Sequence, residues 1–296
     1  MEQTFVSVIV PVFNHAAVLD RAIASILSQS FGNFELIVID DGSHQPAVAS
    51  DDPRVRMLRH DRNLGAGAAR NTGIAAAAGR YIAFLDADDV WHPDKFETQL
   101  ECFNTAPPDI RACFCHYTLK REAGNGWTSR IVAPMPLRPS DPSLLWGCNV
   151  SPGSTMIVHR ACFEDVGPFD EALRALEDWD WLLRFNRRYA AHVVPRVLAT
   201  VYAHPMPRSR SRSTLAALAL LNTKFAEQIA ATGSVNLRKF RSTLMVERAA
   251  HYRRVGQIVR AIMATMRAIS IYPFRNYAFY RQIVGTLLTL CARNPT

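Results

Sequence analysis

The sequence predicts an α/β fold with a Rossmann-like, mostly parallel sheet flanked by helices and followed by a helical extension. Three apolar runs, 6–12, 35–39 and 81–85, stop abruptly at polar residues, and helical patterns separate them. Strands joined through a right-handed helical crossover run parallel, so these segments form one sheet. We therefore expect an α/β domain over 1–206 and a basic, mainly helical extension over 207–296.

The charge of the chain is strongly asymmetric. Residues 1–206 contain 19 Lys and Arg against 24 Asp and Glu, whereas residues 207–296 contain 15 against 2. A basic segment of this kind favours an anionic partner, and a membrane surface and a nucleic acid are the alternatives. We expect an anionic membrane surface or a lipid-linked diphosphate near it, and no nucleic acid, because no groove-reading motif accompanies the arginines.

Two features of the sequence bear on location. The chain has six scattered cysteines, and residues 1–5 lack the basic start of a secretory signal, so we expect reduced thiols and a cytoplasmic protein, peripheral on the inner face of the membrane. Helical patterns cover 214–231 and 237–269, and packing of these helices against the α/β domain is the alternative to membrane contact. The apolar segment 277–291 is shorter than the ~20 residues of a comfortable span and is a candidate interfacial helix.

The opening unit is a strand, a helix, a second strand and an acidic turn. The strand 6–12 is followed by Phe13 and Asn14, and Asn14 is expected to cap the helix that follows. The second strand, 35–39, ends in Asp40 and Asp41. Ligands of such sheets bind at the carboxyl ends of the strands, which is where this acidic turn falls.

A segment rich in alanine and glycine, 63–73, suits a helix packed closely on the sheet after a short strand over 55–58. Its Gly65 and Gly67 imitate a dinucleotide-binding fingerprint, but the residues that follow do not complete the motif. Arg70 is instead a candidate planar donor for a base or a phosphate, with a surface salt bridge as the alternative.

The central strand, 81–85, ends in Asp86, Asp88 and Asp89. Side chains alternate along an extended chain, so Asp86 and Asp88 are expected to point to the same side. Two neighbouring carboxylates favour a hard divalent cation such as Mg²⁺ or Mn²⁺, which fills its other positions with water and substrate phosphates. The alternative is a solvated acidic turn before a helix.

The middle of the chain carries weaker signals. We expect a helix over 93–103, a strand over 112–119 and a loop over the cleft in 120–150. A strand over 156–158 is entered through Gly153, a residue type that permits close approach of the backbone to a substrate, although a tight turn explains it as well.

Acidic residues also begin a helix at Glu177 and Asp178, where the helix dipole alone would favour them. The sharper hypothesis makes Asp178 a general base beside Trp179, an aromatic side chain suited to stacking on a sugar ring. His204 follows an apolar strand over 197–202. It is a candidate ligand for the same metal, with a capped structural histidine as the alternative.

In combination, the motifs resemble the nucleotide-sugar-dependent glycosyltransferases of family 2, which have the GT-A fold. The resemblance covers residues 4–205 and rests on five segments in the expected order: 8–14, 36–43, 63–71, 86–89 and 177–178. Each of these segments alone is common in proteins, whereas all five in this order are specific to the family.

The resemblance implies a role for individual positions. Asp41 and Arg70 would read the uracil, and Asp86 would approach the ribose or the sugar. Asp88 would ligate Mn²⁺ or Mg²⁺, and Asp178 would be the catalytic base. The other residues expected at the substrate, from the resemblance or from their own chemistry, are Pro11, Phe13, Asn14, Gly153, Glu177 and Trp179.

The implied reaction is inverting transfer of a sugar from a UDP-sugar to a hydroxyl of a saccharide or lipid-linked acceptor, in cell-surface polysaccharide or glycolipid assembly. A divalent ion would screen the charge on the departing diphosphate. His204 resembles the family's late metal- or diphosphate-binding histidine, although the spacing after it departs from the pattern. The rivals are a nucleotidyltransferase on a similar sheet, which gives no reason for 177–178, and a catalytically silent scaffold anchored through the basic extension.

Overall fold

The computed structural model describes residues 5–47, 50–123, 126–148, 150–204 and 208–273. The chain forms two compact units. The sheet unit consists of Met1–Asp141 and Cys148–His204, and the helical unit consists of Pro142–Gly147 and Pro205–Thr296. The short segment Pro142–Gly147 thus belongs with the basic C-terminal part and not with its neighbours in sequence.

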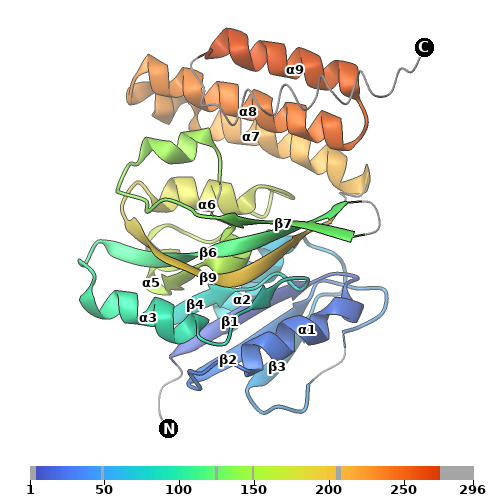
Figure 1. Ribbon diagram of the computed structural model, residues 1–296, viewed down its shortest axis with the longest axis vertical. Coiled ribbons are helices and arrows are strands. Elements are labelled where there is room, and N and C mark those ends of the chain that lie inside the picture. Colours follow the sequence, from blue (N-terminus) through green and yellow to red (C-terminus); the bar gives the residue numbers. More distant parts are fainter. Residues whose placement is uncertain (1–4, 48–49, 124–125, 149, 205–207, 274–296) are drawn as a thin grey trace. The chain divides into compact units, whose positions relative to one another are not determined.

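The sheet unit is built on one mixed sheet (Figure 1). Its described strands are β1 (Val6–Val12), β2 (Phe34–Asp40), β3 (Val55–Arg59), β4 (Tyr81–Phe84), β5 (Val90–Trp91), β6 (Ile110–Ala123), β7 (Gly126–Val132), β8 (Ile157–His159) and β9 (Ala190–Ala203). The strand order is β3-β2-β1-β4-β8-β6-β9-β5, with β7 paired to β6. The first four strands of this order are parallel, and β8 runs antiparallel to both of its neighbours. The predicted α/β class is confirmed, but the sheet is more mixed than expected.

Helices cover both faces of the sheet. They are α1 (Ala16–Leu27), α2 (Ala66–Ala76), α3 (Lys95–Thr105), α4 (Pro152–Thr155), α5 (Ala161–Asp165) and α6 (Glu177–Phe185). On one face, Val8 of β1 shares a core with Leu19 of α1 and Phe96 of α3. On the other face, a Cβ atom at Gly73 of α2 would lie 2.5 Å from Cγ2 of Ile9, so α2 packs closely on β1, as its small residues predict.

An aromatic cluster fixes α6 to the same face as α2. Phe84 of β4 meets Phe163 and Phe169 edge to face, with ring centroids 6.0 and 5.6 Å away. Trp181 of α6 stacks on Phe163 at 4.8 Å. These ring contacts hold α6 beside β4, whose end carries the acidic turn.

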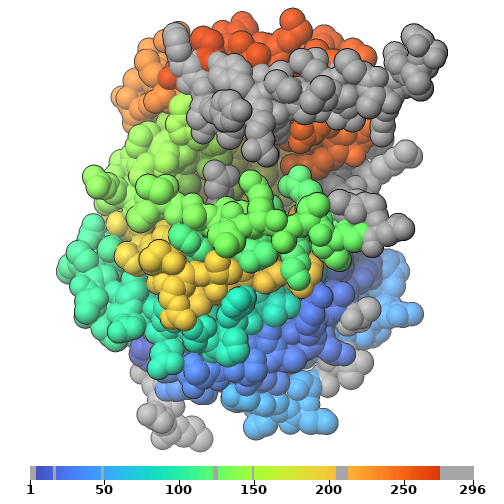
Figure 2. Space-filling model, viewed as in Figure 1, coloured from blue at the N-terminus to red at the C-terminus, as the bar shows by residue number. Residues whose placement is uncertain are grey.

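The loop expected over 120–150 is wrong in part, because Gly126–Val132 forms strand β7 in a hairpin with β6. Residues 126–131 are all exposed, so the segment lacks the alternation of polar and apolar side chains by which a half-buried strand is recognised. Figure 2 shows this green hairpin at the surface of the sheet unit.

The expected helix cap at Asn14 is also wrong. His15 occupies the N-cap position of α1, and Asn14 adopts a left-handed backbone with φ of 56°. The Oδ1 atom of Asn14 instead accepts a hydrogen bond of 3.0 Å from the backbone N–H of His44. Asn14 therefore connects the end of β1 to the turn after β2.

The helical unit contains η1 (Pro142–Trp146), α7 (Arg208–Ala231), α8 (Ser234–Arg254) and α9 (Ile258–Ile271). The single helix expected over 237–269 is divided, because the chain turns at Gly256, whose φ is 77°. α8 packs against α7 and α9, and the Ser242 hydroxyl donates a 2.9 Å hydrogen bond to the carbonyl of Ala268. Among the described helices, none combines the length and apolar content needed to cross a membrane, and the segment 277–291 lies outside the described residues.

Gly42, in the turn after β2, has φ of 73°, and a Cβ atom there would lie 2.4 Å from the carbonyl carbon of Arg62. We expect Gly42→Ala to lower the free energy of unfolding by about 2 kcal/mol or more, because the left-handed backbone and the displaced neighbour both oppose the side chain. Urea denaturation measures this.

Gly32→Ala is the matched control, since no atom of the part of the chain that the structure describes lies within 4 Å of a Cβ atom at Gly32. It should change the free energy of unfolding by less than about 1 kcal/mol. Equal losses in the two variants would contradict the constraint at Gly42.

Candidate active site

The strand β4 ends in a turn that carries three aspartates. The backbone N–H of Asp89 donates to the carbonyl of Asp86 at 2.9 Å, so the chain is folded here and the alternation argument for Asp86 and Asp88 does not apply. Burial, together with the negative charge of Asp86, raises the pKa of Asp88. Both carboxylates reach solvent, with side chains 42% and 24% exposed.

Asp89 has a structural role. It is 2% exposed, accepts the hydroxyl of Ser154 in α4, and accepts the backbone N–H of Tyr202 in β9 at 2.8 Å. Burial, with the charges of Asp86 and Asp88, raises its pKa well above the usual value. Asp89 therefore ties the turn to two other segments of the sheet unit.

Arg70 of α2 joins this turn to α6. Its Nη2 donates to Oδ1 of Asp86 at 2.7 Å, and its Nη1 donates to Oε1 of Glu177 at 2.6 Å. The side chain of Arg70 is only 6% exposed. Burial lowers the pKa of Arg70, but the charges of Asp86, Glu177 and Asp178 outweigh burial and raise it. Both terminal nitrogens of Arg70 are thus engaged by carboxylates of the protein.

Gly153 of α4 lies directly against this ion pair. A Cβ atom there would lie 2.7 Å from Oδ2 of Asp86 and 3.0 Å from Nη2 of Arg70. The close approach that the sequence predicts at Gly153 is therefore made by the protein's own side chains, and Gly153 is itself buried.

α6 begins with two acids in different environments. Glu177 is buried and held by Arg70, whereas Asp178 is only partly buried and accepts the backbone N–H of Trp179 on Oδ1 at 2.7 Å. Burial and the charge of Glu177 raise the pKa of Asp178 to about 6, against the opposing charge of Arg70. Asp178 can therefore take up a proton near neutral pH.

The expectation that Trp179 stacks on a sugar is wrong. Trp179 is 1% exposed, so its ring faces are covered by the core. The sequence shows an aromatic residue beside an acid, but nearly every side chain of α6 after Asp178 points inward.

The carboxylate of Asp41 is buried after β2, with its side chain 4% exposed. Its Oδ1 accepts the backbone N–H of Leu64 at 2.8 Å and lies 2.7 Å from Nδ1 of His60. Its Oδ2 accepts hydrogen bonds from Asn63 and Gly65 at 2.9 and 2.8 Å. Asp41 thus fixes the loop before α2, and contact with a base would require it to exchange one of these bonds.

The residues expected to frame a nucleotide lie at the end of β1. Pro11 is partly buried, whereas Phe13 is 37% exposed and Asn14 is exposed. The backbone N–H of Asn14 donates to the hydroxyl of Ser43 at 2.9 Å, so this end of β1 is fixed to the turn after β2. An exposed ring at adjacent strand ends provides a surface for a planar ligand.

His204, after β9, faces Asp88, with Nε2 3.7 Å from Oδ2. In the described part of the chain, no three His, Cys, Asp or Glu side chains are gathered as metal ligands. A divalent ion at Asp88 would therefore draw on few protein ligands. This donor set fits Mg²⁺ or Mn²⁺, which complete their coordination with water and substrate phosphates.

Sequence reasoning missed the aromatic side chains around His204. Trp127 of β7 is 45% exposed, and its ring lies 5.2 Å from that of Tyr202 and 5.4 Å from that of His204. Arg21 of α1 lies 4.2 Å over the Tyr202 ring and donates to the carbonyl of Asp88 at 2.6 Å. The pairing of β7 with β6 brings Trp127 to this position. The sequence does not predict that pairing, because residues 126–131 lack an alternation of polar and apolar side chains.

Comparison with known proteins agrees with this architecture. The family described as glycosyl transferase family 2 matches residues 7–167. The UDP-Glc:alpha-D-GlcNAc-diphosphoundecaprenol beta-1,3-glucosyltransferase WfgD of Escherichia coli is 38% identical over 104 residues, which are 34% of this chain and 41% of that protein. The chain spans between 17% and 64% of the length of the first four curated relatives that it matches.

Two solved structures share the fold. Residues 1–349 of S. aureus TarS, in complex with UDP, align over 90% of this chain and 89% of that one, with a TM-score of 0.52 and 17% identity. The mannosyltransferase PcManGT from Pyrobaculum calidifontis, in complex with GDP-Man and Mn²⁺, aligns over 98% and 81%, with a TM-score of 0.55 and 18% identity. The expected GT-A fold is confirmed. Because the family match covers more than half of the chain, the protein belongs to glycosyltransferase family 2.

Proposed function

We propose that the protein catalyses inverting transfer of a sugar from a UDP-sugar to a hydroxyl of a saccharide or lipid-linked acceptor. The observation that carries the proposal is the partly buried carboxylate of Asp178, whose pKa is about 6, beside the ion pair of Arg70 and Asp86. A group with such a pKa accepts a proton at neutral pH, as transfer to a hydroxyl requires. A nucleotidyltransferase gives no reason for this base.

The donor is held at the exposed strand ends. We assign Pro11, Phe13 and Asn14 to the nucleotide and Asp86 to the ribose or the sugar. Asp41, whose two oxygens accept bonds within the protein, and Arg70, whose two terminal nitrogens donate to carboxylates of the protein, act by orienting the surrounding loop and turn. A UDP-sugar is favoured because the E. coli relative is named for UDP-Glc and the TarS structure contains UDP.

Asp88 and His204 would hold Mn²⁺ or Mg²⁺. The raised pKa of Asp88, caused by burial and by Asp86, indicates negative charge without full compensation, which a cation would supply. When bound, the ion offsets the negative charge that develops on the leaving diphosphate. The Mn²⁺ in the Pyrobaculum enzyme supports this assignment.

Asp178 removes the proton from the acceptor hydroxyl as its oxygen attacks the anomeric carbon from the face opposite UDP. One displacement of this kind inverts the configuration. The N–H of Trp179 fixes Oδ1, and Oδ2 accepts no hydrogen bond from a described residue, so Oδ2 is the oxygen available to the acceptor. Glu177 cannot replace Asp178 while Arg70 holds it.

We assign the reaction to cell-surface polysaccharide or glycolipid assembly on the cytoplasmic side of a membrane. The E. coli relative is named for an acceptor linked to diphosphoundecaprenol, and a Rhizobium meliloti relative for succinoglycan biosynthesis. The basic extension of this chain would suit an anionic surface.

Asp178→Asn should lower the rate of transfer by about 10²–10⁴-fold, because it removes the base, and leave the Kd for UDP unchanged. The wild-type rate should fall as the pH drops below about 6, where Asp178 becomes protonated, and this limb should disappear in the variant. Glu164→Gln, an exposed acid of α5, is the control for loss of one charge. Transfer by Asp178→Asn at near the wild-type rate would contradict the assignment.

Asp178→Asn lowers the rate of transfer but is expected to raise the free energy of unfolding at high pH. The folded-state pKa of Asp178 lies above the unfolded value, so ionised Asp178 destabilises the folded protein at pH values above about 6, and that cost disappears as the pH falls towards 4. Asp178→Asn should therefore raise the free energy of unfolding at pH 8 and change it less at pH 4.5. If Asp178→Asn lowered the free energy of unfolding at pH 8, the raised pKa of Asp178 in the folded protein would be contradicted.

Asp88→Asn should weaken UDP binding in the presence of Mn²⁺ by at least about tenfold and leave binding in EDTA unchanged. Titration calorimetry in the two buffers measures the difference. Asp20→Asn, an exposed acid of α1, serves as the control. An unchanged Mn²⁺ effect in Asp88→Asn would remove Asp88 from the metal site.

A further inference from the structure

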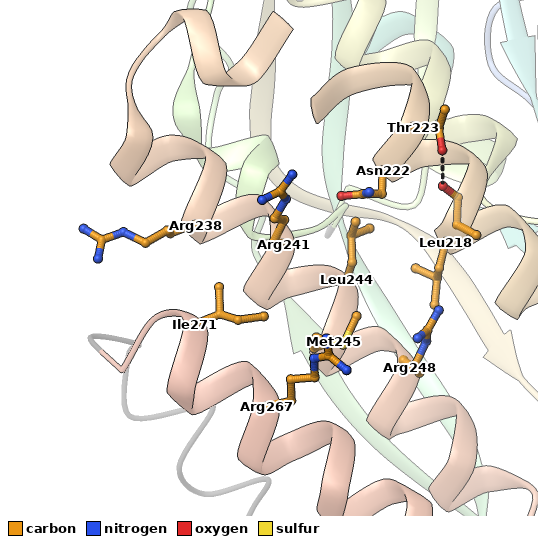
Figure 3. A pocket seen from close by; sticks show the side chains of 11 residues that line it. Leu218, Asn222, Thr223, Arg238, Arg241, Leu244, Met245, Arg248, Arg267 and Ile271 are labelled. Atoms are coloured by element: carbon orange, nitrogen blue, oxygen red, sulfur yellow. Dashed lines mark hydrogen bonds between the residues drawn. The ribbon is translucent and has the colours of Figure 1, made fainter. Parts of the chain in front are cut away.

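The helical unit contains a pocket of about 600 Å³ between its three long helices (Figure 3). α8 lines it with Arg238, Arg241, Leu244, Met245 and Arg248, α9 with Arg267 and Ile271, and α7 with Leu218, Ala219, Asn222 and Thr223. Figure 3 shows Arg241, Arg248 and Arg267 around the apolar side chains, whereas Arg238 reaches away from them. The pocket therefore combines guanidinium groups with an apolar wall.

The helical period produces this combination. Arg241, Leu244, Met245 and Arg248 follow the spacing i, i+3, i+4 and i+7, so they form one stripe of α8. In a helix that only packs on its neighbours, such a stripe is apolar throughout. Here two arginines bracket the apolar pair, and Arg267 of α9 adds a third positive charge to the same pocket.

These positive charges are not compensated within the described residues. No acidic side chain there forms a salt bridge with any of the four arginines of the pocket. Only two acids occur in 208–273, Glu227 and Glu247, and neither lines the pocket. Like charges that line one pocket repel one another, so the pocket favours a bound anion.

Arg248 gives a second, independent indication. Its Nε atom is buried and has no hydrogen-bond partner among the described residues. A buried donor without a partner costs free energy, and an acceptor that reached this atom from the pocket would remove that cost. The exposed arginines of the pocket, Arg238, Arg241 and Arg267, would contribute planar guanidinium groups with paired N–H donors, which suit phosphate oxygens.

We propose that this pocket binds a phosphate or diphosphate group that carries an apolar chain. The arginines match the charged group, and Leu218, Leu244 and Met245 match the chain. Among the described residues that line the pocket, none is aromatic and able to stack on bases, which disfavours a nucleic acid. This proposal is separate from the proposed glycosyl transfer, because each residue that lines the pocket lies in the helical unit, whereas the candidate active site lies in the sheet unit.

The direct test is titration calorimetry with farnesyl diphosphate in EDTA. The Arg241→Gln/Arg267→Gln double variant should bind it at least about tenfold more weakly than the wild type. The double variant Arg254→Gln/Arg260→Gln is the matched control. It removes the same charge from the same two helices at exposed positions outside the pocket, and it should stay within about twofold of the wild type.

Inorganic pyrophosphate tests the apolar wall. The wild type should bind it at least about tenfold more weakly than farnesyl diphosphate, because the chain adds burial of apolar surface. Equal losses in the two double variants, no loss in either, or equal affinity for the two probes would each overturn the proposal.

Asn222→Asp keeps the test valid if the arginine variants do not fold. A carboxylate at Asn222 would face the same arginines, so it should raise the Tm while weakening farnesyl diphosphate binding. A raised Tm with unchanged binding would contradict the site.

Cosedimentation with vesicles distinguishes the two sources of the ligand. Binding to phosphatidylglycerol vesicles that is lost in Arg241→Gln/Arg267→Gln identifies a bilayer phospholipid. Binding of farnesyl diphosphate without binding to the vesicles identifies a separate lipid diphosphate.

Discussion

The site depends on one buried guanidinium group. Arg70 donates to Asp86 at the end of β4 and to Glu177 at the start of α6, and neither segment is otherwise near it in sequence. A buried arginine with two carboxylate partners is costly to desolvate, and it is tolerated because each charge is paired. The pairing leaves no room for a side chain at Gly153 and fixes where α6 begins. Asp178, one residue further, is positioned as a consequence.

This arrangement divides the acids at the edge of the sheet into two groups. Asp41, Asp89 and Glu177 are buried and bonded to the protein, so they hold loops and helices in place. Asp86, Asp88 and Asp178 keep part of their surface in solvent. The proposed chemistry uses the second group, and the first group explains why the second is held in a fixed geometry. A motif alone does not separate them, because both groups consist of acids at strand or helix ends.

The sequence predicted the parts of the fold that bury apolar surface. β1, β2 and β4 are continuous apolar runs, and Asp178 was found as an acid at a helix start. β7 escaped prediction because all but its last residue are exposed, and Trp127 was missed with it. The role of Arg70 was not predictable, since its partners are 16 and 107 residues away and only the packing of α6 on β4 brings them together. Trp179 was misread because local pattern does not reveal which ring faces the core covers.

The most direct measurement of the central claim is the free energy of unfolding of Arg70→Gln, by urea denaturation at pH 7. Removing one member of a buried ion network leaves uncompensated charges, so we expect a loss of about 3–5 kcal/mol. Arg70→Lys should recover little of it, because an ammonium group cannot bridge the two carboxylates as the planar fork does. A loss below about 1 kcal/mol for Arg70→Gln, the range of an exposed salt bridge, would contradict the account.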